Sequence, residues 1–369
     1  MISDQAKKVL LLLRDRKNVL LDGAPATGKT LLVSEVREAF EGIDVSSYDP
    51  NAAIAIPKAG GIGVAEWMPS PLRNDRRVFS TAFFSGTKHR DFVRGIVPVP
   101  GEGSLTFRVS RGTLFEAAEH AKTSNGTSLV VIEEISRGPA VAAFGGSIVA
   151  FEGDKRLADD GSVLPKTTFF ETFDNDGNRL EYALPSHLYL LATMNRADTS
   201  VEALDVAFLR RWAPFKLYPD RRILDDFFAV ASDSDPTPPV ATNPGDLHRA
   251  AIEAWSAINR RITSGRGADF QVGHGVLMGV VPEPADGDLV RAYRYISESW
   301  EMIMSHIAEV FFGDERAIAE VLSIGPHNPQ HPYGLREFVF AGEPRTELTL
   351  NPEGVDIFGV LRAVAFAAE

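Results

Sequence analysis

The distribution of apolar residues predicts alternating helices and strands over the first 220 residues of the chain. Short, mostly apolar runs that are typical of strands buried on both faces occur at 18–22, 129–132 and 187–194. Apolar residues recur at helical spacing in the stretches around them, namely 3–16, 29–40, 111–122, 139–152 and 200–211. Three buried strands flanked by helices indicate an α/β fold with a parallel sheet, whose functional site lies at the carboxyl ends of the strands.

Two segments interrupt this alternation. The stretch from 51 to 76 is rich in glycine and proline, which predicts an inserted loop before regular structure resumes at Phe79–Phe84. The triplet Asn175-Asp176-Gly177 predicts the turn of a hairpin at 168–183. Neither segment belongs to the predicted parallel sheet.

The pattern changes in the second half of the chain. The acidic, proline-rich segment 233–239 is the best candidate for a linker, because it can neither bury apolar surface nor continue a helix. Beyond it, 246–263 and 288–322 carry apolar residues at helical spacing and predict a mainly helical region. We therefore expect a core domain at 1–220 and a smaller helical domain at 221–369.

The composition excludes several classes of function. The 369 residues are 44% hydrophobic and 24% charged, as in soluble globular proteins, and no apolar run is long enough to cross a membrane. The first residues do not form a secretory signal, and the chain has no cysteine, which excludes disulfides, thiolate catalysis and cysteine-ligated zinc. A cytoplasmic protein without a membrane partner is expected. The net charge of −12 argues against a surface that attracts nucleic acid as a whole.

A phosphate-binding loop pattern, GxxxxGK[ST], directly follows the first apolar run. It consists of Gly23, Ala24, Pro25, Ala26, Thr27, Gly28, Lys29 and Thr30. In this pattern a glycine-rich turn opens a helix and aims its amides at a polyphosphate. Lys29 can reach the β- and γ-phosphates, and Thr30 can hold Mg²⁺. The chain is therefore predicted to bind a nucleotide with Mg²⁺ as cofactor.

Two acids, Glu133 and Glu134, end the second apolar run. In P-loop NTPases an acid at such a strand end supports Mg²⁺ and another polarises the attacking water. Neighbouring residues on a strand point to opposite sides, which favours Glu133 as the metal residue and Glu134 as the catalytic one. Mg²⁺ requires nearly octahedral geometry, so the longer Glu133 in place of the usual Asp implies a bridging water or weaker turnover.

The third apolar run ends in the sequence Thr193-Met194-Asn195-Arg196-Ala197-Asp198. Asn195 can orient the lytic water or contact the γ-phosphate, although an asparagine at a strand end also serves as a turn former. Asp198 precedes Thr199-Ser200-Val201-Glu202, a capping-box pattern that starts a helix.

Two arginines, Arg210 and Arg211, end the helix predicted at 200–211. Arginines at a helix end can interact with the helix dipole alone. They can also reach into the site of a neighbouring subunit and neutralise charge in the transition state. The sequence does not distinguish these roles.

These residues resemble the AAA+ NTPases of the McrB type, the motor subunits of modification-dependent restriction systems. The resemblance covers most of the chain and rests on GAPATGKT at 23–30, VVIEEISRG at 130–138, FGG at 144–146, EGDKR at 152–156, LPSHLYLLATMNRADTS at 184–200, LDVAFLRRW at 204–212 and FQVGHG at 270–275. It implies an αβα AAA+ core followed by a helical lid, assembled as a homo-oligomeric, hexameric ring with nucleotide between neighbours.

The resemblance also assigns roles to single residues. It places Lys29 and Thr30 in the P-loop pair, Glu133 and Glu134 at the strand end, Asn195 and Asp198 in the MNxxD pair, and Arg210 or Arg211 as the trans-acting finger. His274 matches a lid motif, where a structural histidine and a functional one are both open.

The chain departs from the family pattern at several positions. Glu133 replaces Asp, Ser136 and Pro139 stand where Asn is favoured, Gly146 replaces Glu, and Leu209 stands where a third Arg often precedes the pair. Altered turnover or nucleotide preference is therefore open, and the substrate is ATP or GTP.

The expected function is NTP hydrolysis by a ring-forming motor that drives or regulates a separately encoded, McrC-like nuclease in antiviral defence. The P-loop begins at residue 23, and no nuclease constellation of paired acids and a lysine is evident, so recognition and cleavage of DNA are expected to come from the partner. Two alternatives remain open at this point: a MoxR-like ATPase that remodels protein complexes, and a nucleotide-bound scaffold with weak hydrolysis.

Overall fold

The computed structural model describes residues 2–42, 67–100, 105–195, 197, 204–230, 238–279, 288–326, 328–329, 331–350 and 356–365. The chain forms two compact units, which are described separately. Unit 1 contains residues 1–22 and 29–216, and unit 2 contains residues 23–28 and 217–369. Most of the predicted inserted loop at 51–76 and of the linker at 233–239 lies outside the described residues.

A five-stranded sheet forms the centre of unit 1. Its order is β2-β5-β8-β1-β9, with β1 at Asn18–Gly23, β2 at Asp75–Ala82, β5 at Gly126–Glu133, β8 at Leu188–Met194 and β9 at Ala213–Leu217. The pairs β2–β5, β5–β8 and β8–β1 are parallel. The three strands predicted from apolar runs are confirmed as β1, β5 and β8. They are buried along most of their length, because helices cover both faces of a parallel sheet.

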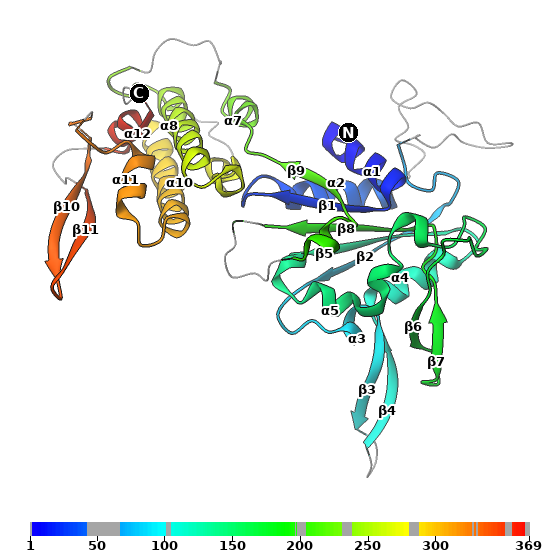
Figure 1. Ribbon diagram of the computed structural model, residues 1–369. Coiled ribbons are helices and arrows are strands. Elements are labelled where there is room, and N and C mark those ends of the chain that lie inside the picture. Colours follow the sequence, from blue (N-terminus) through cyan, green and yellow to red (C-terminus); the bar gives the residue numbers. More distant parts are fainter. Residues whose placement is uncertain are drawn as a thin grey trace. The chain divides into compact units, whose positions relative to one another are not determined.

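Helices lie on both faces of this sheet. They are α1 (Asp4–Arg16), α2 (Lys29–Glu41), α3 (His89–Phe92), α4 (Thr113–Lys122), α5 (Ala140–Phe144) and α6 (Val206–Leu209). Figure 1 shows α1 and α2 on one face and α3, α4 and α5 on the other. The predictions of α1, α2 and α4 are confirmed to within two residues.

Two predicted helices are much shorter than expected. The helix predicted at 139–152 ends at Phe144, because Gly145 has a φ of 51°, and a 3₁₀ turn follows at Gly145–Val149. Of the helix predicted at 200–211 the structure describes only the single turn α6, and the residues before Leu204 lie outside the described part. Aromatic packing of Phe144 against Phe208 holds both short helices in place.

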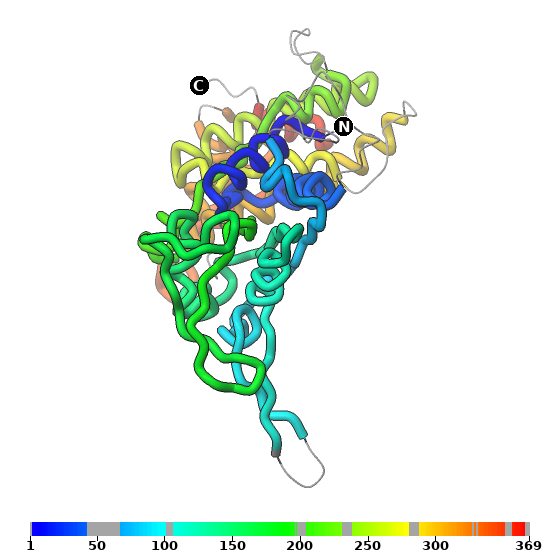
Figure 2. The backbone as a smooth tube through the Cα atoms, turned by 90° about the vertical axis from the view of Figure 1, so that its right-hand side faces the viewer, coloured from blue at the N-terminus to red at the C-terminus, as the bar shows by residue number. Residues whose placement is uncertain are grey.

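Two hairpins extend from unit 1. One pairs β6 (Phe170–Phe173) with β7 (Arg179–Tyr182), as predicted, and the other pairs β3 (Arg94–Pro100) with β4 (Leu105–Arg111). The β3–β4 hairpin was not predicted, because prolines disfavour a strand and most side chains of β3 are at least partly exposed. Figures 1 and 2 show both hairpins extending from the side of the sheet that carries α3, α4 and α5.

Unit 2 is a helical bundle with one hairpin. Its elements are α7 (Arg221–Phe227), α8 (Pro244–Gly265), α9 (Gly275–Met278), α10 (Leu289–Val310), α11 (Glu315–Leu322), β10 (Tyr333–Phe340), β11 (Glu343–Leu350) and α12 (Ile357–Ala365). The helix predicted at 246–263 is confirmed as α8, and the region 288–322 is divided into α10 and α11 at Gly313, which has a φ of 77°.

The described part of the second half is mainly helical, as predicted, but the β10–β11 hairpin was not predicted. Its strands are largely exposed and bury neither face, so the apolar pattern did not predict them. The apolar residues of α8 and α10, including Trp255 and Trp300, form the core of this unit. Within the described part of the chain, no helix is long and apolar enough to cross a membrane.

Candidate nucleotide site

The P-loop turn at 23–28 has a tightly constrained backbone. Ala26 and Gly28 adopt positive φ angles of 58° and 85°. The Thr27 hydroxyl donates a hydrogen bond to the carbonyl of Ala24 at 2.7 Å. A Cβ on Gly23 would lie 2.5 Å from the carbonyl oxygen of Leu217, so only glycine fits there. The turn is therefore preformed by its own backbone, as binding of phosphate by main-chain amides requires.

A second turn of unit 2, residues 273–275, packs directly on the P-loop. The amide of Gly275 donates to the carbonyl of Ala26 at 2.9 Å. A Cβ on Gly273 would lie 2.1 Å from the carbonyl oxygen of Pro25, closer than any real contact allows. The FQVGHG segment that resembles a lid motif is therefore a brace for the phosphate-binding turn, and it holds Ala26 in its positive φ conformation.

His274 lies in this brace with only 6% of its surface exposed. Its Nδ1 accepts a hydrogen bond from the amide of Asp220 at 3.3 Å, which leaves the proton of the neutral ring on Nε2. Burial lowers the pKa of His274, and the charge of Asp220 opposes this shift. The ring is thus held as a neutral side chain, and its Nε2 is 3.9 Å from the place where a Cβ on Gly28 would lie.

In unit 1, α2 begins at Lys29, the lysine of the P-loop pattern. Burial lowers the pKa of the Lys29 ammonium, whereas the charges of Glu134 and Asp22 raise it. Asp22 is buried, and Thr30 is exposed at the start of α2. Glu134 and Asp22 therefore both lie within electrostatic range of Lys29, although the three residues belong to different elements of the chain.

The two acids of the second strand end have different environments. Glu133 is the last residue of β5 and is exposed. Glu134 leaves the strand in the left-handed conformation, with φ 52° and ψ 50°, and its amide donates to the hydroxyl of Thr193 at 3.1 Å. Its Oε2 is buried and accepts no hydrogen bond from any described residue, while Arg137 Nε lies 3.4 Å away. The reversal of the backbone, rather than strand alternation, separates the two carboxylates.

Thr193 is a site residue that the sequence reasoning did not single out. It ends β8 together with Met194, and its hydroxyl accepts a hydrogen bond from the amide of Glu134, the residue that follows the neighbouring strand β5. This bond holds the two strand ends in register. Asn195 follows β8 directly and is half-buried, and its Oδ1 accepts from the amide of Ala197 at 3.2 Å. Asp198 lies outside the described residues. The signal that could have identified Thr193 is its position directly before Met194 and Asn195, at the end of the third apolar run.

The two candidate finger arginines have different surroundings. Arg211 is mostly covered, with 12% of its side chain exposed, and its Nε forms an ion pair with Glu152 Oε1 at 2.9 Å. Its guanidinium also donates to the carbonyl of Ala207. Arg210 is exposed, and its side chain has no hydrogen bond or ion pair with the residues that the structure describes.

Both arginines lie at the end of β1 that is opposite to the P-loop. The carbonyl of Arg211 accepts from the side chain of Asn18, the first residue of β1, at 3.2 Å. Gly23, the first P-loop residue, is the last of the six residues of β1. At about 3.3 Å per residue, the two ends of this strand are roughly 17 Å apart. An arginine at the Asn18 end cannot serve the P-loop of its own chain.

The donor atoms near the P-loop fit a hard cation. The described residues contain no group of three or more histidine, aspartate or glutamate side chains arranged as a metal site. Thr30 and Glu133 nevertheless offer exposed oxygen ligands at the start of α2 and the end of β5. Mg²⁺ bound to a nucleotide needs only one or two protein ligands of this kind, because it retains waters and phosphate oxygens.

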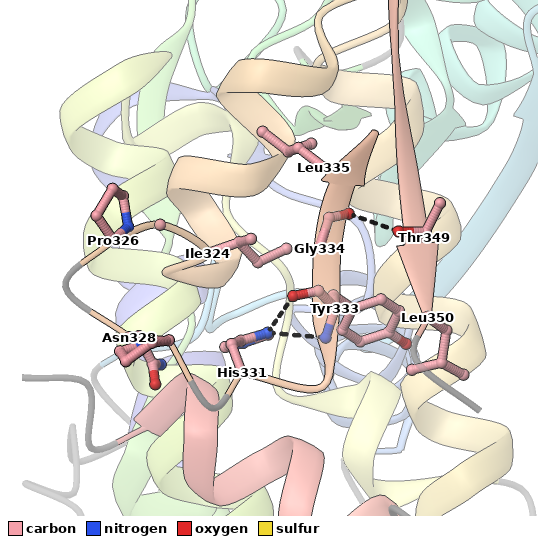
Figure 3. Close-up of a pocket in the computed structure, with 11 residues that line it drawn as sticks. Ile324, Pro326, Asn328, His331, Tyr333, Gly334, Leu335, Thr349 and Leu350 are labelled. Atoms are coloured by element: carbon pink, nitrogen blue, oxygen red, sulfur yellow. Dashed lines mark hydrogen bonds between the residues drawn. The ribbon is translucent and has the colours of Figure 1, made fainter. Parts of the chain in front are cut away.

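The cavities within the described parts of the units include the following three. One, of about 360 Å³, is lined by Arg210 and Arg211. A second, of about 400 Å³, lies between the root of the β3–β4 hairpin and the β6–β7 hairpin with its turn, where Arg94 and Arg111 both donate to Asn175 Oδ1. The third, of about 650 Å³, lies between the loop after α11 and the β10–β11 hairpin, and no predicted site residue lines it (Figure 3).

A parallel sheet with a P-loop after β1, acids after β5 and an asparagine after β8 defines an α/β protein of the P-loop NTPase class. No protein-family model matches the chain. It is 27% identical over 205 residues to the type II restriction enzyme BsuMI component YdiS of Bacillus subtilis, covering 53% of this chain and 56% of the relative. It is 26% identical over 212 residues to the EcoKMcrB subunit of the type IV methyl-directed restriction enzyme of Escherichia coli, covering 57% of this chain and 37% of that one.

These matches support a McrB-like AAA+ protein. The match spans about half or less of the length of these relatives. Among solved structures, a putative ATPase from Cytophaga hutchinsonii aligns with a TM-score of 0.32 and 12% identity over 98% of this chain and 88% of that one, a likeness too weak to support any argument.

Proposed function

We propose that this chain is a Mg²⁺-dependent nucleoside triphosphatase that works as a ring-forming motor and drives or regulates a separately encoded nuclease. The observation that carries the proposal is the register of the parallel strands, which brings Asp22, Glu134 and Asn195 to the same edge of the sheet, while the helix after β1 begins at Lys29. A lysine on the P-loop helix and a buried carboxylate oxygen on the neighbouring strand are the groups that phosphoryl transfer to water requires.

The chemistry follows from these positions. The P-loop amides and Lys29 bind the phosphates, and Glu134 Oε2, which accepts no hydrogen bond from the described residues, is the acceptor for the proton of the attacking water. Asn195 orients that water or contacts the γ-phosphate. Thr30 and Glu133 would hold Mg²⁺, which neutralises charge on the phosphates when bound.

A neighbouring copy of the chain supplies a further positive charge at the γ-phosphate. We assign this role to Arg210, because its guanidinium is exposed and unpaired among the described residues, whereas Arg211 is bound to Glu152. An arginine finger of this kind contributes about 10³–10⁵-fold in rate. The separation of Arg210 from its own P-loop supports action in trans.

The proposal of a nuclease partner rests on the names of the relatives. Both curated relatives are named as components or subunits of restriction enzymes, which supports a nuclease partner and contact with DNA through that partner. Nothing in the P-loop reads a nucleobase, so both ATP and GTP are candidate substrates.

Turnover assays with Mg-ATP and Mg-GTP test the proposal. We expect Glu134→Gln to bind nucleotide with an affinity close to that of the wild type but to hydrolyse it at least 100-fold more slowly, since general-base catalysis contributes about 10²–10⁴-fold. Lys29→Ala should lose binding. Phosphate release and a fluorescent nucleotide analogue measure the two properties separately.

The control for this assay is Glu133→Asp, which restores the usual acid and should hydrolyse at least as fast as the wild type. Equal hydrolysis by wild type and Glu134→Gln would contradict the assignment. Binding and assembly without turnover in the wild type would instead favour a nucleotide-bound scaffold.

A further inference from the structure

The cavity of about 360 Å³ in unit 1 has an excess of unpaired positive charge. It lies where β1 and β9 begin, and Arg16, Lys17, Arg210 and Arg211 line it. Asp15, Glu152 and Asp154 also line it, so a sum of formal charges suggests near neutrality. The contacts of the individual side chains show otherwise.

Each acid of this cavity has a cationic partner. Asp15 pairs with Arg14 at 2.7 Å, Asp154 with Lys166 at 3.4 Å, and Glu152 with Arg211 at 2.9 Å. None of these pairs involves Arg16 or Arg210.

Arg16 and Arg210 are the two exposed guanidiniums of this cavity. Within the described part of the chain, neither side chain has a hydrogen bond or an ion pair. Lys17, the third cation without an acidic partner, donates instead to the hydroxyl of Tyr189 at 3.3 Å. Two guanidiniums with ten donor N–H groups in total therefore line one polar cavity without a partner among the described residues.

We propose that Arg16 is a second trans-acting cation, which contacts the phosphates of the nucleotide bound by a neighbouring copy of this chain, beside Arg210. The inference rests on the proposed function, because it requires the ring and the role of Arg210. A guanidinium group binds phosphate oxygens through paired N–H donors. Two guanidinium groups suit a triphosphate, whose negative charge is spread over many oxygens, better than they suit a single carboxylate. The nucleotide of the same chain is excluded, since its P-loop follows the far end of β1.

A structural role for Arg16 makes a different prediction. Arg16 lies in the last turn of α1, where a cation stabilises the helix dipole by about 0.3–1 kcal/mol. Loss of that interaction would lower the melting temperature slightly and would act only on the chain that carries the substitution. A trans-acting residue instead affects the site of its neighbour.

The test is a subunit-mixing experiment with Mg-ATP and Mg-GTP. Arg16→Ala should lower turnover of the assembled protein by about tenfold, which corresponds to about 1.4 kcal/mol, and Arg16→Lys should recover part of this loss. The matched control is Lys8→Ala, which removes an exposed cation from the same helix outside the cavity and should hydrolyse like the wild type.

Mixing separates action in trans from action in cis. Glu134→Gln chains have an inactive site of their own but an intact Arg16, so adding them to Arg16→Ala chains should raise the turnover per active site. The nucleotide concentration at which the chains assemble, measured by mass photometry, should be higher for Arg16→Ala than for Lys8→Ala. Affinity under dilute, unassembled conditions should be unchanged.

The outcomes distinguish the two proposals. If Arg210→Ala loses turnover and is rescued by mixing but Arg16→Ala behaves like Lys8→Ala, the inference about Arg16 is overturned and the proposed function stands. A loss in Arg16→Ala that mixing does not rescue also overturns it, in favour of a helix-end role or a carboxylate ligand. If neither variant differs from the wild type, the trans-acting mechanism itself fails.

Discussion

At the scale of single residues, adjacent side chains of one type serve different purposes in this protein. Arg210 and Arg211 follow one another, yet Arg210 is exposed and Arg211 is partly buried in an ion pair with Glu152. Glu133 and Glu134 also follow one another, and the left-handed conformation of Glu134 turns its carboxylate away from the direction of the strand. A non-glycine residue in this conformation stores about 1–3 kcal/mol of strain, which a functional site commonly retains.

A buried histidine makes stability depend on pH. His248 is 3% exposed, its ring packs 4.3 Å from that of Phe228, and burial lowers its pKa from 6.5 to about 4. Between these two values the unfolded chain binds a proton that the folded chain does not. The free energy of unfolding is therefore not reduced by His248 above pH 6.5. It falls by up to about 3 kcal/mol as the pH drops to 4.

We expect His248→Phe to reduce this dependence, because phenylalanine keeps the ring stacking and does not titrate. Melting temperatures measured from pH 7.5 to 4.5 should fall less steeply for the variant than for the wild type. Parallel curves for the two proteins would show that His248 is not a buried neutral residue.

At the scale of elements, the short turn 273–275 of unit 2 constrains the backbone of the P-loop. It donates a hydrogen bond to the P-loop from Gly275 and leaves no space for a side chain at Gly273. This turn thus constrains the P-loop through main-chain contacts, which do not depend on a particular side chain.

We expect Gly273→Ala to weaken nucleotide binding by more than tenfold, since its Cβ would displace Pro25 and Ala26. The control is Gly334→Ala in β10, where the nearest atom to an added Cβ, Thr349 Oγ1, is 3.6 Å away. Titration with a fluorescent nucleotide measures both variants. Unchanged affinity in Gly273→Ala would mean that the brace yields without moving the P-loop.

The hairpins of unit 1 depend on contacts between distant segments. Arg94 and Arg111 frame the β3–β4 hairpin, and both donate to Asn175 in the turn of the β6–β7 hairpin, at 2.6 and 3.0 Å. Burial is the main cause that lowers the pKa of Arg94, with the charge of Arg111 acting in the same direction. One neutral amide therefore connects two strand pairs that share no sheet.

At the scale of the whole molecule, the proposed mechanism requires more than one copy of the chain. Lys29 and Glu134 lie where strands end, and Arg210 lies where β1 and β9 begin. In one chain these groups are on opposite ends of the sheet, so only a head-to-tail arrangement brings them together. Such heterologous contacts form a closed ring when the rotation between copies closes.

We expect a monomer without nucleotide and a larger closed assembly with Mg-ATP or Mg-GTP and the Glu134→Gln variant, which retains its substrate. Native mass measurement checks this expectation, with Lys29→Ala as the control that should remain a monomer. A single mass under all conditions would contradict it.

Much of the sheet was predictable because its signals are local. β1, β5 and β8 are buried on both faces, so each is a continuous apolar run, and the residues with chemistry follow directly after it. β2, β9 and the β3–β4 and β10–β11 hairpins were missed, because strands with partly exposed residues or prolines have no such run. The short α5 and α6 were overestimated, because a glycine with positive φ ended one of them and tertiary packing on Phe144 bounded both.

The sequence by itself determined the P-loop, the acids and the asparagine after the strands, since covalent spacing holds each motif together. Only the tertiary structure decided which arginine is free, why Arg16 lies beside Arg210, how Thr193 holds Glu134, and that residues 273–275 brace the P-loop. These relations join segments that are far apart in the chain. Each relation depends on a contact between distant segments, or on the lack of an ion pair among the described residues. Neither produces a periodic or local pattern in the sequence.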